Sequence, residues 1–359
     1  MSEFKISTHT YNFNCPNCGA NFVLRHDTDK FFRIECYVCH SIVNVDASEI
    51  GEYNPDPDKL FELGLEQYNL DDFNKAKDFF EEAAKCNHPL AIYYLGNIYN
   101  YGLGVANKSL DQAYKCYSKA ASMGCDKAMN KLALWYWDGH YIEQNKLKAK
   151  ELFLKAAENG NVNSMYNLGL LLTENNDYNS EELKAAIYWL NKAADLGLNI
   201  SYNKIGDLLE ENGELNSAFE YYLKAANAGA ATGQYNTARF LKNGSLIGNG
   251  SFKRVDYKEA FYWAKLSAAQ YYGLGMYILG ECYMDGIGVV KNINKAACWY
   301  QKAADKNISF AQFELGVLYI NSKDIPRDLN KAKNWLNKAY DNGLEEAKQY
   351  LDILKSEDL

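Results

Sequence analysis

The sequence repeats one pattern of small residues along most of its length. An alanine recurs eight times, and seven residues after each stands another alanine or, once, a serine. The first set is Ala76, Ala113, Ala149, Ala186, Ala218, Ala260, Ala296 and Ala332, and the second is Ala83, Ala120, Ala156, Ala193, Ala225, Ser267, Ala303 and Ala339. Stacked repeats bury a core between neighbouring units and leave a long surface free for binding. The pattern therefore predicts a helical solenoid of about eight helix–turn–helix repeats.

The spacing divides each repeat into a constant part and a variable part. Twelve residues separate the second small residue of one repeat from an apolar anchor in the next, as from Ala83 to Leu95. The step from an anchor to the following alanine varies, and it is longest from Thr237 to Ala260. Length variation is therefore confined to the loop that joins the first helix of a repeat, helix A, to the second, helix B. The anchors on helix A are Leu63, Leu95, Leu132, Leu168, Ile205, Thr237, Leu279 and Leu315.

Residue size around the anchors fits packed layers of helices. Glycine or alanine directly follows each anchor, where a small side chain lets helices A and B approach closely. Aromatic side chains of helix B are predicted to fill the gaps between layers. These aromatics are Tyr117, Phe153, Trp189, Tyr221, Trp263, Trp299 and Trp335. Residues that tolerate a left-handed backbone are predicted to end helix B. They are Gly124, Gly160, Gly197, Gly229, Asn307 and Gly343.

Two repeats carry enough of a known consensus to be compared with a family. The second repeat has Ala91, Leu95, Gly96, Tyr99, Gly102, Gly104, Val105, Ala113, Tyr117, Lys119, Ala120, Ala121 and Gly124. This pattern resembles a Sel-1-like repeat, a longer relative of the tetratricopeptide unit, and the repeat from Gly275 to Ala304 matches it more fully. The first and fifth repeats have tetratricopeptide spacing. The resemblance extends from about Pro57 to Leu344, and it implies an all-α, right-handed superhelical solenoid with adaptor or scaffold work and no shared reaction.

Two CxxC pairs near the start of the chain predict a metal site. The cysteines are Cys15, Cys18, Cys36 and Cys39. Four thiolates complete a tetrahedral zinc shell without an open position, and their spacing resembles that of a small zinc ribbon. Strand-like composition is found at Asn21–Leu24, Phe31–Glu35 and Ser41–Val45. Because this segment has few apolar residues, its folding is expected to need the metal. Zinc is therefore the expected cofactor, and His40 is an alternative ligand.

The charge of the ribbon segment bears on its role. Residues 1–50 hold four Lys or Arg against six carboxylates, so no basic stripe exists to neutralise phosphates. We favour a structural or protein-docking role over nucleic-acid recognition and over a redox-active thiol pair. The five other cysteines are irregularly placed and are predicted to be buried thiols in a reducing compartment. These cysteines are Cys86, Cys116, Cys125, Cys282 and Cys298.

Composition and segment boundaries complete the predicted organisation. We expect a zinc ribbon at residues 1–45, a connector at 46–56, the solenoid at 57–344 and a capping helix at 345–359. Residues 243–251 form an insertion whose composition predicts a mobile loop. The net charge of −8 argues against general affinity for nucleic acid or anionic membranes. Without a spanning segment or a secretion signal, the chain is expected to be soluble and cytoplasmic.

Catalytic patterns are weak throughout the sequence. The five histidines lie in different repeats or turns, and none pairs with another residue in a metalloprotease pattern. Ser201 to Lys204 forms an S-x-x-K string, but the companion S-D-N and K-T-G elements are missing. The pairs Gly102–Gly104 and Gly286–Gly288 lie in predicted turns with no preceding strand, so they do not indicate a nucleotide site. We therefore expect no enzymatic activity.

The predicted binding surface is the concave groove lined by helix A. Residues two before and two after each anchor point away from helix B, because a helix repeats every 3.6 residues. Two before the anchor are Tyr93, Asn130, Tyr166, Asn203, Tyr235, Tyr277 and Phe313, and two after it are Asn97, Asp207, Arg239 and Glu281. Tyrosines offer apolar area with a polar tip, and an asparagine amide can hold a peptide backbone. In the alternative interpretation, these aromatics pack between adjacent A helices.

Two classes of function follow from these features. The first is an adaptor whose groove binds a protein or peptide while the ribbon docks a second partner. The alternative is a nucleic-acid-associated regulator whose ribbon touches nucleic acid while the repeats recruit proteins. The sequence identifies neither the partner nor an oligomeric state.

Overall fold

In the computed structural model the chain divides into unit 1, residues 1–144, and unit 2, residues 145–359, and each is described by itself. The residues described are 9–14, 21–26, 31–35 and 42–46, for which only the backbone is considered, and 56–104, 107–174, 180–244 and 255–356. No helix within these ranges is long and apolar enough to cross a membrane.

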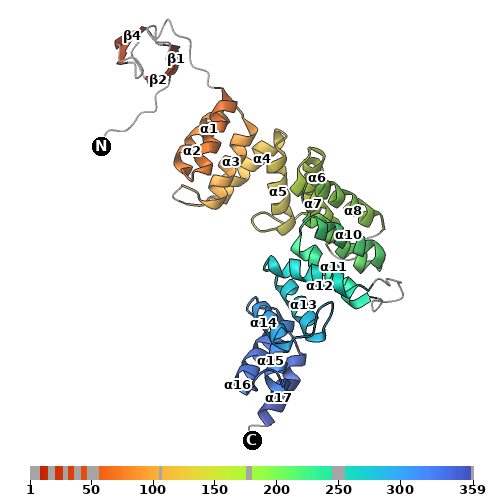
Figure 1. The fold of residues 1–359 in the computed structure, drawn as a ribbon. Helices are drawn as coiled ribbons and strands as arrows, with labels where there is room; N and C mark the ends of the chain where they lie inside the picture. The colour runs from red at the N-terminus through yellow and green to blue at the C-terminus, as the bar shows by residue number, and fades with distance from the viewer. Residues whose placement is uncertain are drawn as a thin grey trace. The chain divides into compact units, whose positions relative to one another are not determined.

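Unit 1 begins with two antiparallel pairs of strands (Figure 1). The strands are β1 (His9–Asn14), β2 (Asn21–His26), β3 (Phe31–Glu35) and β4 (Ile42–Asp46). The β1–β2 pair closes at Asn14 opposite Asn21, and the β3–β4 pair closes at Glu35 opposite Ile42. Composition predicts β2, β3 and β4 but not β1. The four cysteines of the CxxC pairs lie outside the described residues.

Helices A and B alternate after the strands, with odd-numbered helices in the A position up to α15. Unit 1 contains α1 (Pro57–Asn69), α2 (Phe73–Lys85), α3 (Pro89–Tyr101), α4 (Leu110–Ser122) and α5 (Asp126–Asp138). Unit 2 contains α6 (Lys146–Glu158), α7 (Val162–Leu172), α8 (Ser180–Asp195), α9 (Ile200–Glu211), α10 (Leu215–Asn227), α11 (Ala231–Asn243), α12 (Tyr257–Ala269), α13 (Gly273–Asp285), α14 (Ile293–Ala304), α15 (Ser309–Asn321), α16 (Leu329–Asp341) and α17 (Glu346–Ser356). The predicted all-helical repeat array is confirmed.

Local sequence sets both ends of helix B. At the start of α12, α14 and α16, the side chains of Asp256, Asn292 and Asp328 each accept a hydrogen bond from the backbone N–H three residues later. Such caps satisfy backbone donors that have no partner inside the helix. At the other end, the predicted terminators all have positive φ values, from 60° at Asn307 to 98° at Gly197. The predicted helix ends are therefore confirmed.

The core depends on small residues at the recurring positions. Ala76, Ala113 and the corresponding alanines of the later repeats are fully buried. A Cβ atom added at Gly96 would lie 2.5 Å from the ring of Tyr117, and one added at Gly206 would lie 2.5 Å from the ring of Tyr222. Helix A therefore packs directly on an aromatic ring of helix B, and a larger residue after the anchor would separate the two helices.

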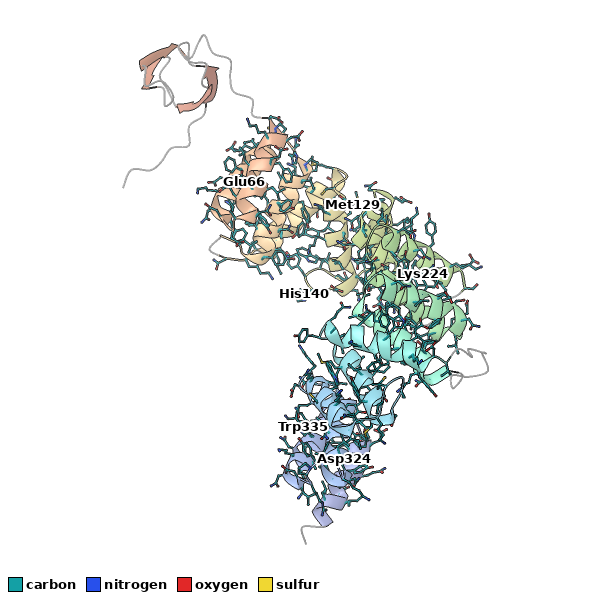
Figure 2. All side chains as sticks on the ribbon, viewed as in Figure 1. Glu66, Met129, His140, Lys224, Asp324 and Trp335 are labelled. Atoms are coloured by element: carbon teal, nitrogen blue, oxygen red, sulfur yellow. The ribbon has the colours of Figure 1, made fainter. Side chains whose placement is uncertain are left out.

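Aromatic residues of helix B are paired with lysines three positions later. In unit 2, four such pairs place the lysine Nζ atom near the ring centroid. The distances are 5.2 Å for Lys192 and Trp189, 4.4 Å for Lys224 and Tyr221, 4.1 Å for Lys302 and Trp299, and 4.2 Å for Lys338 and Trp335. Figure 2 labels Lys224 and Trp335 on this part of the chain. Four of the predicted gap-filling aromatics are thus half-buried rings that carry a cation, whereas Tyr117, Phe153 and Trp263 are buried in the core as gap-filling predicts.

The curvature of unit 2 defines an inner face. Helix α11 contacts both α9 and α13, whereas the intervening B helices are farther from one another. Helices A therefore lie on the inner side of this part of the array. We call the surface formed by α9, α11, α13 and α15 the inner face of unit 2. Helix α17 packs on α16 through Ala347, Leu351 and Leu354.

Candidate functional site

The residues two positions before the anchors are all half-buried on helices A. Tyr93 and Asn130 belong to unit 1, and the other five belong to unit 2. Two positions after the anchors, Asp207, Arg239 and Glu281 are also half-buried. Asn97 is different, because only 7% of its surface is exposed and its Oδ1 accepts a 2.8 Å hydrogen bond from the hydroxyl of Tyr117. Asn97 therefore takes part in the packing of unit 1.

Polar side chains join α9 to α11 on the inner face of unit 2. The Asn236 amide donates a 3.0 Å hydrogen bond to Oδ1 of Asn203, whose own amide donates to Asp207 at 3.2 Å. The hydroxyl of Tyr222 on α10 lies 2.9 Å from an Asp207 oxygen and 2.7 Å from a Glu210 oxygen. Side chains from two helices A and one helix B thus form one connected network.

A bidentate ion pair between α9 and α11 is also part of this network. Arg239 on α11 donates from Nη1 to Oε1 of Glu210 at 2.9 Å and from Nη2 to Oε2 at 2.5 Å. Burial opposes ionisation of Glu210, but the hydrogen bonds from Arg239 and Tyr222 outweigh it and hold the pKa of Glu210 below its ordinary value. Glu210 is therefore a carboxylate whose charge is compensated inside the protein.

Asp207 is less well compensated than Glu210. Burial raises the pKa of the Asp207 carboxyl above its ordinary value, although the hydrogen bond from Tyr222 opposes this shift. The Tyr222 hydroxyl carries a single hydrogen, so it can donate to Asp207 or to Glu210 but not to both at once. Asp207 thus retains acceptor capacity on the inner face.

A second polar group joins α11 to α13. Lys242 donates from Nζ to Oε2 of Glu281 at 2.7 Å, and the hydroxyl of Tyr277 donates to Oε1 at 3.3 Å. Further along the face, burial and the nearby carboxylates of Glu281 and Asp285 raise the pKa of Glu314. Two of the carboxylates on this face, Asp207 and Glu314, are therefore held in surroundings that disfavour their charge. The inner-face network is Asn203, Asp207, Glu210, Tyr222, Asn236, Arg239, Lys242, Tyr277 and Glu281.

The two ion pairs follow a rule that is visible in the sequence. Glu210 and Lys242 both stand five residues after an anchor, and Arg239 and Glu281 both stand two residues after the next anchor. Each pair therefore joins position +5 of one repeat to position +2 of the following repeat. Sequence reasoning missed Glu210, Lys242 and Asn236 because it considered only two positions around each anchor. Opposite charges at these two positions would have indicated both pairs.

The aromatic residues of the inner face contact neighbouring helices. The ring of Tyr235 lies 5.9 Å from that of Tyr272, and the ring of Tyr277 lies 5.8 Å from that of Tyr300. Phe313 meets Tyr350 of α17 edge to face at 5.3 Å, and Tyr166 of α7 is half-buried. These rings hold the helices together and keep part of their surface exposed, so packing and binding are compatible roles for them.

A metal-binding or catalytic site would require several suitable side chains to meet within the described ranges. Within them, no group of three or more His, Cys, Asp or Glu side chains is placed to hold a metal ion. Ser201, the first residue of the S-x-x-K string, is fully buried on α9. The CxxC cysteines fall outside these ranges. Of the other cysteines, Cys125 and Cys282 are buried as predicted and Cys116 is half-buried, but the prediction of buried thiols is wrong for Cys86 and Cys298, which are exposed.

Comparison with known protein families identifies the family of the repeats. A family model described as "Sel1 repeat" matches residues 60–88, 89–125, 126–161, 162–198, 205–229, 231–272, 273–308 and 309–344. The chain belongs to the Sel1 repeat family. Sel1 repeats mediate protein–protein interactions. The crystal structure of a Sel1 repeat protein from Oxalobacter formigenes is 26% identical, covers 83% of this chain and 87% of that one, and superimposes with a TM-score of 0.65.

Other Sel1 relatives are named as regulators. Chitin synthase regulatory factor 3 of Schizosaccharomyces pombe is 25% identical over 64% of this chain and 25% of its own length. Chitin synthase regulator SKT5 of Saccharomyces cerevisiae is 29% identical over 53% of this chain and 29% of its own length. An exopolysaccharide production negative regulator of Rhizobium meliloti is 26% identical over 47% of this chain and 68% of its own length. The match thus spans less than a third of either yeast regulator.

Proposed function

We propose that the chain is a non-enzymatic adaptor that binds a protein or peptide on the inner face of unit 2. The observation that carries the proposal is the inner-face network, which presents polar side chains from three successive A helices. Exposed edges of amides, carboxylates and tyrosines can pair with the backbone of an extended segment. The regulators among the Sel1 relatives favour a regulatory role for this adaptor.

The charges of the face favour a basic partner segment. Glu210 and Glu281 are neutralised by Arg239 and Lys242, whereas Asp207 and Glu314 lie where burial disfavours their charge. A lysine or arginine from a partner would stabilise these carboxylates and lower their pKa values. We therefore expect the bound segment to carry positive charge together with backbone groups for the amides.

Affinity purification of the intact chain from its native cells tests this proposal. The variants Asn203→Ala and Tyr235→Ala should each reduce recovery of the specific partner about tenfold, a typical effect for a central interface residue. Asn130→Ala tests the corresponding position in unit 1. Tyr262→Ala, on an exposed part of α12, is the matched control and should leave recovery unchanged.

Two results would contradict the adaptor proposal. If the inner-face variants lower the melting temperature but leave partner recovery intact, these residues serve packing alone. If recovery disappears after nuclease treatment, nucleic acid bridges the association, and the alternative of a nucleic-acid-associated regulator is favoured.

We also propose that Cys15, Cys18, Cys36 and Cys39 bind one structural zinc ion that supports a second docking module. Each CxxC pair occupies the first and fourth positions of a six-residue connection between two paired strands. Two such connections supply four thiolates, the donor set of a closed tetrahedral zinc site. This agreement between strand pairing and cysteine spacing supports the proposal.

Elemental analysis of freshly purified protein should give one zinc per chain. Cys36→Ser should remove the zinc and leave the helical circular dichroism signal and partner recovery by unit 2 intact, since the repeats form their own core. Cys86→Ser, which alters an exposed cysteine of the helical array, is the control and should retain the metal. Metal-free wild-type protein would contradict the zinc proposal without affecting the adaptor proposal.

A further inference from the structure

Unit 2 contains a cavity on the side opposite its inner face. The cavity has a volume of about 350 Å³ and lies between two successive B helices, α6 and α8, with α7 beneath it. Its apolar surface comes from Leu154, Leu168, Leu172 and Trp189. This volume is near the lower limit for ligand sites, about 300 Å³, and suits one large side chain or a small fragment.

The cavity is explained by a break in the repeat pattern. Four residues after the anchor, helices α3, α5, α13 and α15 carry a tyrosine, whereas α7, α9 and α11 carry Leu172, Leu209 and Leu241, and α1 carries Gln67. The B helices that precede α9 and α11 carry Ile187 and Phe219 in the core, whereas the missing ring at α7 leaves a cavity. Each of these tyrosines contacts a helix B. They are Tyr99, bonded to Glu81; Tyr136, bonded to Tyr114; Tyr283, 5.6 Å from Phe261; and Tyr319, beneath Lys331. Leu172 lacks the ring that fills the space between B helices in those repeats.

Neighbouring residues do not replace the missing ring. Phe261 of α12 directly follows the first alanine of its repeat. In α6 the same position holds Lys150, which is exposed. Lys331 of α16 directly precedes the first alanine of its repeat. In α8 the same position holds Ala185. A long, solvated side chain and a methyl group therefore flank the cavity, and both leave it open.

The mouth of the cavity has charge of both signs on opposite walls. Lys150 lies on the α6 wall, and Glu181 and Glu182 lie on the α8 wall. Glu181 is also paired with Lys184 at 3.0 Å, and both side chains are exposed. An occupant that places a carboxylate toward α6 and a cation toward α8 would complement these walls.

We infer that this cavity binds an aromatic side chain, tyrosine or phenylalanine, from a protein segment that carries an acidic residue on one side of the ring and a basic residue on the other. The ring takes the place that tyrosines of the chain itself fill in four other repeats. The segment lies across α6 and α8, so the site is separate from the inner-face network and does not depend on that proposal.

A peptide titration tests the inference on the full chain. The probe is acetyl-Glu-Tyr-Lys-amide, and binding is followed by the ¹⁹F signal of 5-fluorotryptophan at Trp189, assigned through Trp189→Phe. Replacing the probe's tyrosine by alanine should weaken binding at least about tenfold, because the ring provides most of the buried apolar area. Free p-cresol should bind more weakly than the peptide, since it lacks the flanking charges.

Variants that fill the cavity provide the decisive comparison. Leu172→Tyr restores the repeat pattern and should abolish probe binding while raising the melting temperature by about 2 °C. Ala185→Phe fills the space from α8 and should also abolish binding, which covers the case in which Leu172→Tyr fails to fold. Leu147→Tyr makes the same change at an exposed position of α6 and should bind the probe normally.

Three results would overturn the inference. Equal binding of p-cresol and the peptide would make this a site for small aromatic molecules. Absence of any probe-dependent signal change in the wild-type chain would mean that the cavity accepts no ring. Undiminished probe binding by both Leu172→Tyr and Ala185→Phe would place the bound ring elsewhere on the chain.

Discussion

Helices A of unit 1 and of unit 2 use different side chains in the contacts between successive repeats. In unit 1, Phe61 stacks on His88 at 4.7 Å, and Tyr94 packs edge to face on Tyr68 at 5.2 Å. Tyr68 stands five residues after its anchor, and in α9 and α11 of unit 2 the same position holds Glu210 and Lys242, which form ion pairs with Arg239 and Glu281. Aromatic contacts therefore dominate one unit, and a hydrogen-bonded charge network dominates the other.

This difference shows how the fold separates architecture from recognition. The residue just before the anchor is Tyr94 in α3, Asn236 in α11 and Glu314 in α15, although all three helices keep the same register. The buried alanines and the glycines that meet helix B fix the backbone, so the helix A positions are free to vary. The binding properties proposed for each unit therefore depend on a few side chains that do not set the register of the helices.

The largest expected effect comes from removing one partner of the unit 2 network. Arg239→Met should lower the free energy of unfolding by about 2 to 3 kcal/mol, because Glu210 would be left partly buried without its cation. The matched change in unit 1, Lys131→Met, removes a cation that lies 5.6 Å from the ring of Tyr101 and should cost about 0.5 kcal/mol. Urea unfolding followed by circular dichroism measures both values. Equal losses of unfolding free energy would contradict the proposed difference between the units.

Glycine substitutions test what the two units share. An added Cβ at Gly96 or at Gly206 would lie 2.5 Å from a tyrosine ring of helix B. Gly96→Ala and Gly206→Ala should therefore each lower the free energy of unfolding by about 1 to 2 kcal/mol through overpacking. Thermal unfolding of the two variants provides the comparison. If the substitution leaves the free energy of unfolding unchanged in only one unit, helices A and B of that unit do not approach each other as closely.

Removing a single hydroxyl from unit 1 should have a smaller effect. Tyr117→Phe deletes the donor to Asn97, a buried amide, and should lower the free energy of unfolding by about 1 kcal/mol. The double variant Tyr117→Phe with Asn97→Leu should recover part of this loss, because no unpaired acceptor then remains. Urea midpoints distinguish the two variants. A double variant that is less stable than the single one would contradict this assignment.

A change of pH tests the contribution of the buried carboxylates of unit 2 to its stability. Because the folded state raises the pKa of Glu314, the folded chain binds more protons than the unfolded chain as the pH rises above 4.5, the ordinary value for a glutamate. The stability contributed by the protonated carboxyl is present below that value and is lost as the pH passes the raised pKa. Glu314→Gln should therefore be more stable than the parent at pH 7, and the difference should disappear near pH 4. A constant difference at all pH values would refute this.

Most of the fold can be predicted from the sequence, because the repeats mark it many times. Buried alanines, twelve-residue spacing and left-handed terminators place the helices without any knowledge of contacts. Strand β1 contains Thr10, Tyr11 and Phe13, but the strand-depleted Asn12 and Asn14 interrupt them, so it is missed. The +5 to +2 ion pairs and the cavity at Leu172 are also missed, because each depends on side chains that vary between repeats and on how they combine with the neighbouring helices.

Site-specific photo-crosslinking tests the central claim most directly. Benzoylphenylalanine placed at Tyr235 on the inner face, or at Tyr262 on exposed α12, replaces one aromatic residue by another within unit 2. The account predicts that a protein partner in native cells crosslinks to position 235 and not to position 262, and that Asn203→Ala abolishes the crosslink. Crosslinking of the same partner at position 262 but not at position 235 would contradict the claim that unit 2 recognises its partner on the inner face.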